Sequence, residues 1–297
     1  MSQIPQKTIV TPHGAVEYAD IGHGPAIVYF HGFGIGNQRI VEIEAGLIEA
    51  GFRLIVPNRP GYYNTPLDGR TASADCTDLV ADLLDVLQIE STAIIGSSGG
   101  GFYASGFAAR HPNRTSCLVL ECSNTHPWTS PGWLPQNSRW TRPLLIRPWL
   151  RKCLLWSFRQ QLRFAAPQAH LKQAAGLRHA EVEGDAEAIE FCQLLDAMRH
   201  CLRHQPAGFE NDFVVLVNEL GIENQTIDCP VLVVHDRFDP VAPIENVHWA
   251  MQRMPQAEWL DVHTAGHLIW LGRDAERVRH RRLEFLHAHA DASVDRS

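Results

Sequence analysis

The chain has 297 residues, a hydrophobic fraction of 45%, a charged fraction of 20% and a formal net charge of −7 at pH 7. Its length suits one large domain or a core with a sub-domain, and its composition is that of a globular protein with a substantial core. The negative net charge disfavours nucleic acid as a partner, because phosphate binding needs a basic surface.

Residues 1–14 contain no apolar segment of signal-peptide length. No apolar run anywhere reaches about 18 residues, so we expect neither an export signal nor a transmembrane helix. The seven cysteines are odd in number and scattered, and they form no CxxC pair. We therefore expect reduced thiols packed as small hydrophobic side chains and a cytoplasmic location.

Short apolar segments alternate with helical stretches in the first part of the chain. Segments 8–10 and 15–18 flank a Pro-His-Gly turn and predict an antiparallel hairpin at a sheet edge. Strands that are apolar on both faces and alternate with helices indicate a mostly parallel α/β sheet flanked by helices. Such strands are predicted at 26–30, 54–56, 93–95 and 117–120, and helices at 74–87 and 102–110.

The alternation stops after Cys122, and the next stretch has a helical pattern with frequent prolines. Strands are predicted again at 231–234 and 258–262, followed by a helix from about 268 to 288. We therefore predict a helical insert, or cap, within one α/β core. The predicted units are a core formed by residues 1–123 and 228–290, a cap at 124–227 and a flexible tail at 291–297.

The segment 96–100, with the sequence GSSGG, follows a predicted strand and precedes a predicted helix. It fits G-x-S-x-G, in which a nucleophilic serine occupies a tight turn and the residues two positions away must be small. Gly96 and Gly100 select Ser98, since a nucleophile at Ser97 would place an isoleucine at one of these positions. A phosphate-binding loop is the alternative, but the Gly-Lys-Ser/Thr of such loops is missing here.

With His31-Gly32-Phe33 at the end of strand 26–30, the chain resembles the α/β-hydrolase superfamily of capped serine esterases and lipases. The resemblance implies an oxyanion hole formed by the backbone N–H groups of Phe33 and Gly99. His31 is expected to hold this loop and not to act as a base.

The segment 58–62, with the sequence NRPGY, is similar to the family's D-R-P-G-Y/F-G segment. Asn58 replaces the usual aspartate, and Tyr63 replaces the usual small residue. The segment is structural in the family, so these departures change no expectation about the chemistry.

The resemblance also implies an acid after a later strand, in the chain order serine, acid, histidine. The segment 235–243, with the sequence HDRFDPVAP, resembles the family's H-G-x-x-D-x-x-x-P and places Asp239 at the position of the acid. Asp236 stands where the family has glycine, and we expect it to disturb this loop. Glu121, at the end of an earlier strand, is the alternative acid.

His267 follows a glycine and precedes a predicted helix, similar to the family's G-H-x-x-x-x-E, which implies that it is the base. His263 is its competitor but lacks the preceding glycine. His200 and His204 have the i, i+4 spacing of helical metal ligands, as do His263 and His267. Neither pair lies in H-E-x-x-H, so we expect no metal and no cofactor.

The predicted cap is aromatic and basic, and residues 125–180 include no Asp or Glu. We favour an apolar substrate pocket beneath it. For the bases we favour pairing with the acidic residues that follow position 180 over contact with an anionic membrane. The tryptophans are Trp128, Trp133, Trp140, Trp149 and Trp156, and the bases are Arg139, Arg142, Arg147, Arg151, Lys152, Arg159, Arg163, Lys172 and Arg178.

Together these features predict hydrolysis of a carboxylic ester of a hydrophobic small molecule by Ser98, His267 and Asp239, through a covalent acyl-enzyme. Hydrolysis of a carbon–carbon bond, of a lactone or of an N-terminal Pro peptide would use the same three residues. A ligand receptor with the hydrolase fold is the non-enzymatic alternative. The sequence does not fix the oligomeric state.

Overall fold

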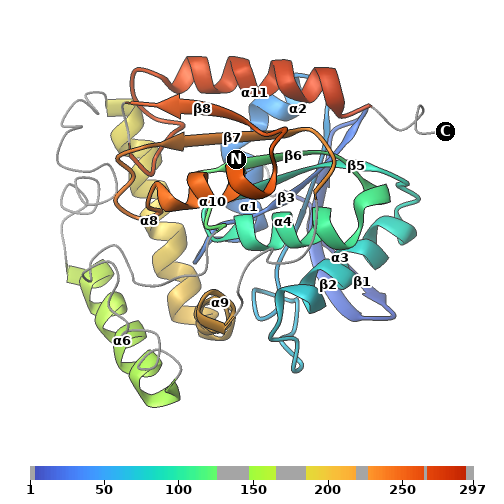
Figure 1. The fold of residues 1–297 in the computed structure, drawn as a ribbon. Coiled ribbons are helices and arrows are strands. Elements are labelled where there is room, and N and C mark those ends of the chain that lie inside the picture. The colour runs from blue at the N-terminus through green and yellow to red at the C-terminus, as the bar shows by residue number, and fades with distance from the viewer. Residues whose placement is uncertain (1–3, 126–146, 165–184, 219–226, 264–265, 292–297) are drawn as a thin grey trace.

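The structure is a computed structural model that describes residues 4–125, 147–164, 185–218, 227–263 and 266–291 (Figure 1). The described residues form an eight-stranded sheet with the order β1-β2-β4-β3-β5-β6-β7-β8. β2 pairs antiparallel with β1 and β4, and all the other pairs are parallel. The strands are β1 (Lys7–Thr11), β2 (Gly14–Ile21), β3 (Ala26–Phe30), β4 (Arg53–Pro57), β5 (Thr92–Ser97), β6 (Thr115–Glu121), β7 (Val231–Asp236) and β8 (Glu258–Val262).

Helices cover both faces of the sheet. β5 and β6 are buried along their whole length, as apolar strands in the middle of a parallel sheet require. The mostly parallel sheet flanked by helices is thereby confirmed, together with the antiparallel hairpin at its edge. One face packs against α3 (Ser73–Val86), α4 (Gly100–Arg110) and α10 (Glu245–Arg253), and the other against α1 (Asn37–Ile43), α2 (Ala45–Glu49) and α11 (Ala275–His289).

The last helix begins later than its apolar pattern predicts. Residues 268–274 form turns, and α11 starts only at Ala275. Gly272 has a φ of 79°, a left-handed conformation that interrupts a helix, while Leu268 and Leu271 are buried in the core. The apolar side chains thus continue the helical pattern although the backbone does not.

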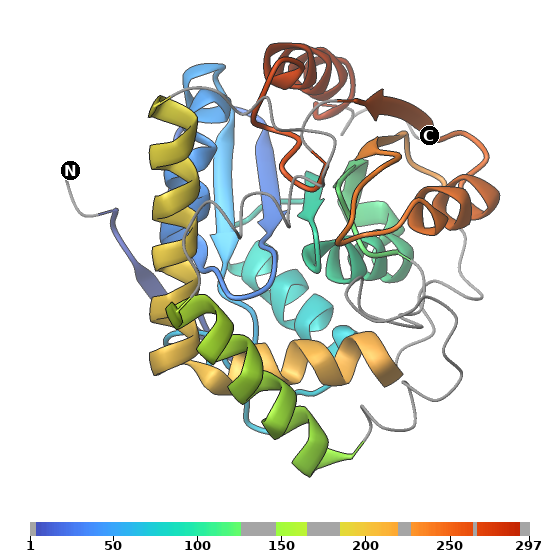
Figure 2. The same ribbon diagram turned by 90° about the vertical axis from the view of Figure 1, so that its left-hand side faces the viewer.

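Three described helices lie between β6 and β7 in the chain: α6 (Pro148–Phe164), α8 (Asp185–His204) and α9 (Pro206–Asn218). They contact one another, and Figure 2 shows them grouped beside the sheet. Within the described part of residues 124–227, which we call the insert, there is no strand. The limits of core and cap stay predictions, and the predicted tail lies outside the described residues apart from Asp291. No helix in the described ranges is long and apolar enough to cross a membrane.

Candidate active site

Ser98 occupies the turn between β5 and α4 and has a φ of 51°, an uncommon conformation for a residue with a side chain. Its amide donates a hydrogen bond to the Glu121 carbonyl at 2.9 Å. A Cβ on Gly96 would lie 2.4 Å from the Ala104 Cβ, and a Cβ on Gly100 would lie 2.0 Å from the Phe30 carbonyl oxygen. Positions 96 and 100 must therefore both be glycine. This requirement explains why the G-x-S-x-G pattern selects Ser98 and not Ser97.

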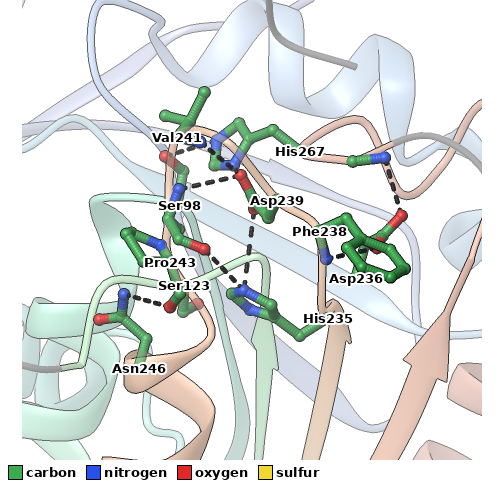
Figure 3. A network of polar contacts seen from close by, with 12 residues as sticks. Ser98, Ser123, His235, Asp236, Phe238, Asp239, Val241, Pro243, Asn246 and His267 are labelled. Carbon is green, nitrogen blue, oxygen red and sulfur yellow. Dashed lines mark hydrogen bonds and ion pairs between the residues drawn. The ribbon is translucent and has the colours of Figure 1, made fainter. Parts of the chain in front are cut away.

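Three of the predicted residues meet at the carboxyl ends of their strands (Figure 3). The His267 Nε2 lies 3.0 Å from the Ser98 Oγ, and its Nδ1 lies 2.7 Å from the Asp239 Oδ2. A carboxylate only accepts hydrogen bonds, so the shared proton belongs to Nδ1, and Nε2 is left to accept the serine hydroxyl proton. The geometry brings these side chains together in the order that nucleophilic catalysis needs, and their catalytic roles stay predictions.

Asp239 is held by its own loop. Its Oδ1 accepts hydrogen bonds from the amides of Val241 at 2.7 Å and Ala242 at 2.9 Å, which leaves Oδ2 directed at His267. The Nε2 of His235 lies 2.8 Å from the Ala242 carbonyl oxygen. Burial lowers the pKa of His235 despite the nearby Asp239 carboxylate, so the ring is neutral and braces the loop.

Asp236 does not disturb the loop, contrary to expectation. It is fully buried, and its Oδ1 accepts the Phe238 amide at 2.8 Å, as in an Asx turn. Its Oδ2 accepts the Gly266 amide at 3.0 Å (Figure 3). The carboxylate therefore ties the acid loop to the residue before His267, which a glycine at position 236 could not do.

Glu121 lies next to the serine turn, but its carboxylate contacts other residues. Its buried carboxylate is 2.9 Å from an Arg282 guanidinium nitrogen and accepts the Tyr29 hydroxyl at 3.3 Å. Burial raises the pKa of Glu121, with Arg282 opposing that shift. His263 is also remote, since its ring is exposed and lies 3.6 Å from Asp261. The alternative acid and the competing base thus both have other partners.

The loop after β3 lies directly against the serine. A Cβ on Gly32 would lie 3.3 Å from the Ser98 Cβ, and a Cβ on Gly99 would lie 2.0 Å from the Phe33 ring. The predicted oxyanion residues Phe33 and Gly99 are therefore adjacent. His31 is fully buried, and its Nδ1 lies 2.9 Å from the Gly32 carbonyl oxygen. Burial, aided by Arg59, lowers its pKa well below the usual value, in keeping with a residue that holds the loop.

The segment after β4 is buried scaffold, although it departs from the family pattern. Asn58 donates to the Glu17 carboxylate at 2.7 Å and accepts the Asn37 amide at 2.9 Å. Tyr63 has a φ of 47°, and a Cβ on Gly36 would lie 2.1 Å from its ring. Both departures are accommodated by specific neighbours.

The insert brings aromatic side chains to the oxyanion loop. Phe209 and Phe213 of α9 each pack against Phe33 at a ring-centroid distance of 6.3 Å. Trp149 and Trp156 of α6 are instead 60% and 64% exposed. Trp128, Trp133 and Trp140 lie outside the described residues. Among the described residues of the insert, Phe209 and Phe213 thus pack directly against the oxyanion loop, and neither was singled out in the sequence.

Sequence reasoning also missed a buried ion pair between the core and the insert. Arg59, after β4, and Asp212, in α9, are both buried and joined by two hydrogen bonds. The available signal was an aspartate directly before the apolar run from Phe213 to Val217, where an unpaired carboxylate would be costly if buried.

The histidine pair of the insert with metal-ligand spacing lies at the surface. His200 and His204 are exposed neighbours on α8, with ring centroids 4.6 Å apart. No group of three His, Cys, Asp or Glu side chains that could hold a metal ion occurs among the described residues.

Comparison with known proteins identifies the family of the chain. Residues 25–274 match the family model described as alpha/beta hydrolase fold. An uncharacterized hydrolase from Bacillus subtilis, YcgS, is 29% identical over 287 residues, which cover 94% of this chain and 98% of that protein. A pimeloyl-[acyl-carrier protein] methyl ester esterase from Aromatoleum aromaticum is 26% identical over 254 residues, which cover 83% of this chain and 92% of that protein.

One further relative is named for a different substrate. A 2-hydroxy-6-oxononadienedioate/2-hydroxy-6-oxononatrienedioate hydrolase from Comamonas testosteroni is 31% identical over 107 residues, only 34% of this chain and 37% of that protein. Among solved structures, an alpha/beta hydrolase fold protein from Nakamurella multipartita superimposes with a TM-score of 0.74 at 25% identity, covering 96% of this chain and 99% of that one.

Proposed function

Because the chain belongs to the alpha/beta hydrolase fold family, we propose that it is a serine esterase that cleaves a carboxylic ester of a hydrophobic small molecule. The observation that carries this proposal is the continuous hydrogen-bonded series from Ser98 Oγ through His267 to Asp239, at 3.0 and 2.7 Å. Relatives that are methyl ester esterases favour an ester over other acyl compounds.

In the proposed reaction, the Ser98 Oγ attacks the ester carbonyl carbon while its proton passes to the His267 Nε2. The N–H groups of Phe33 and Gly99 stabilise the negative charge on the former carbonyl oxygen. The tetrahedral intermediate collapses when the carbon–oxygen bond to the alcohol breaks, and His267 returns the proton to the departing alkoxide.

Release of the acid repeats these steps with water. The His267 Nε2 removes a proton from a water molecule, which attacks the acyl carbon and displaces the Ser98 Oγ. The proton then returns to the serine oxygen. Asp239 keeps the imidazole in the required tautomer throughout, because the carboxylate oxygen that faces Nδ1 only accepts a hydrogen bond.

The aromatic side chains near Phe33 support a hydrophobic substrate. Phe33 is half-buried, and Phe209 and Phe213 pack against it beside the proposed oxyanion hole. Aromatic walls with few polar groups bind apolar ligands by removing their surface from water. We therefore expect esters with alkyl or aromatic acyl groups to be preferred over short polar ones.

A fluorophosphonate probe tests the nucleophile. We expect the probe to label the wild-type chain covalently and to leave Ser98→Ala unlabelled, since only an activated serine reacts. Ser97→Ala is the matched control, because Ser97 is the adjacent hydroxyl but is buried at the end of β5. A folded wild-type chain that stays unlabelled would contradict the esterase proposal and every other serine hydrolase activity. The non-enzymatic ligand receptor would then be the remaining hypothesis.

Hydrolysis of a carbon–carbon bond is the second candidate, favoured by the match to the Comamonas testosteroni hydrolase. A p-nitrophenyl ester series of increasing acyl length, run beside a 2-hydroxy-6-oxo-dienoate, separates the two. Turnover of the dienoate with a kcat/KM well above that of every ester would replace the ester proposal.

A further inference from the structure

The backbone on either side of Phe33 is held by hydrogen bonds. The Gly32 carbonyl belongs to the same peptide unit as the Phe33 N–H, and it accepts hydrogen bonds from Arg59 Nη2 at 3.1 Å and from His31 Nδ1. The Gly34 N–H, in the following peptide unit, donates to the Tyr62 hydroxyl at 3.1 Å. Because a peptide unit is planar, the direction of its C=O fixes the opposite direction of its N–H.

Two of these side chains depend on one carboxylate. The Nη1 and Nη2 atoms of Arg59 donate to the Asp212 Oδ1 at 2.5 Å and Oδ2 at 2.9 Å, as a bidentate pair. The Tyr62 hydroxyl donates to Oδ2, and the Tyr103 hydroxyl donates to Oδ1 at 3.1 Å. Asp212 thus contacts both side chains that hold the peptide units flanking Phe33, although it is 153 residues from Arg59 in sequence.

Because the ion pair between Arg59 and Asp212 is buried, neither charge can be compensated by water. The side chains of Arg59 and Asp212 are 1% and 2% exposed. Burial alone lowers the pKa of Arg59, but the Asp212 carboxylate and Tyr103 raise it, and the net direction is upward. The guanidinium therefore stays charged, and removal of its partner would leave an uncompensated buried cation. Without the two hydrogen bonds to Asp212, the orientation of the guanidinium toward the Gly32 carbonyl is no longer fixed.

The helix that carries Asp212 is seated on the same loops. The Gly208 amide of α9 donates to the Gly61 carbonyl at 3.0 Å, and a Cβ on Gly61 would lie 2.7 Å from Gly208. Phe209 contacts the oxyanion loop as well, since a Cβ on Gly34 would lie 3.2 Å from its ring. The insert is therefore part of the framework around Phe33 as well as a potential cover.

We propose that Asp212 is a positioning residue of the oxyanion hole, which sets the direction of the Phe33 N–H through Arg59 and Tyr62. The inference rests on the proposed serine hydrolase function, but it assigns to the insert a role in transition-state stabilisation. A residue with this role contributes more to the tetrahedral state than to substrate binding.

The test is Asp212→Asn, in which an amide N–H faces the Arg59 guanidinium. We expect kcat for a p-nitrophenyl ester to fall by about 10- to 100-fold with KM nearly unchanged, somewhat less than the loss of a whole oxyanion donor. The affinity for phenylboronic acid, which forms a tetrahedral adduct with the serine, should fall by a similar factor. Asp20→Asn is the matched control, because Asp20 forms a bidentate pair with Arg53 on β4; kcat and boronate affinity should be unchanged in this variant.

A second variant keeps the test decisive if Asp212→Asn fails to fold. Tyr62→Phe removes only the hydroxyl between Asp212 and the Gly34 amide, and we expect a loss of about 3- to 10-fold in kcat and in boronate affinity. Boronate affinity that is unchanged in both folded variants, or in Tyr62→Phe alone where only it folds, would overturn the inference. Boronate binding does not require ester turnover, so a wild-type chain that binds boronate but cleaves no ester contradicts only the ester proposal.

Discussion

The two halves of the candidate site are supported in different ways. The acid and base are supported from nearby in the chain, since Asp239 and Asp236 bond to His267 and Gly266 across only 28 and 30 residues. The oxyanion half depends on the pair between Arg59 and Asp212, which spans 153 residues and joins the core to the insert.

This difference indicates how each half can fail. The acid and base loops follow β7 and β8, which are adjacent parallel strands, so the sheet itself brings them together. The oxyanion loop needs α9 to be docked. Changes in the acid–base half should therefore act on proton transfer with little effect on the insert, whereas changes at the core–insert contact should weaken the tetrahedral state.

The largest expected effect is that of Asp239→Asn. Two backbone amides already occupy Oδ1, so the new amide nitrogen must take the place of Oδ2 and face the His267 Nδ1. That contact favours the tautomer with the proton on Nε2, which cannot accept the serine proton. We expect kcat for a p-nitrophenyl ester to fall on the order of 10³- to 10⁴-fold.

Glu121→Gln is the control for this prediction, because Glu121 is the other carboxylate near the serine turn. Its partner is Arg282, so this variant should lose stability in urea unfolding but keep kcat within about tenfold of wild type. A kcat lower than that of Asp239→Asn would show that the acid had been assigned to the wrong residue.

A smaller effect is expected for Asp236→Ala, which cuts the tie between the acid loop and Gly266. The amides of Phe238 and Gly266 lose their acceptor, and His267 gains freedom to leave its hydrogen bonds. The hydrogen bond of the Gly266 amide is buried, so its loss costs about 1–3 kcal/mol in stability at most. We expect kcat to fall about tenfold. Asp236→Asn keeps one acceptor oxygen, so its kcat should lie between those of wild type and Asp236→Ala. Equal kcat in all three would mean that catalysis does not need the hydrogen bond between Asp236 and Gly266.

The same contrast explains what the sequence could predict. Ser98 was predicted from its glycine-flanked turn after a strand, and the family resemblance implied Asp239 and His267 after two later strands. The parallel sheet brings the ends of these strands together. The buried strands were predictable because they are apolar on both faces. The start of α11 was not, because Leu268 and Leu271 continue the apolar pattern through a turn set by a left-handed glycine.

Asp212 shows the limit of such reasoning. A helical pattern tells which residues share a face, but not which loop that face will contact. The partner of Asp212 lies in a segment that the family pattern marks as structural, so nothing local linked Arg59 to the oxyanion loop. The role of Asp236 was misjudged for a related reason, because its acceptor bond to Gly266 exists only after β7 and β8 pair.

The smallest effect is expected on the exposed side of the insert. Trp149 and Trp156 on α6 are 60% and 64% exposed, unlike the buried Asp212 of α9. In the double variant Trp149→Ala, Trp156→Ala we expect kcat within about twofold of wild type, and stability within about 0.5 kcal/mol for each substitution. We also expect neither wild type nor variant to float with anionic vesicles.

Val10→Ala on β1 is the control for an exposed apolar side chain outside the insert, since Val10 is 78% exposed. Flotation of wild type that is lost only in the tryptophan variant would make α6 a membrane-binding helix. A tenfold or larger fall in kcat without flotation would instead place this face on the path of the substrate. The second result would narrow the contrast, since α6 and α9 would then both serve the reaction, α9 from within the protein and α6 from its surface.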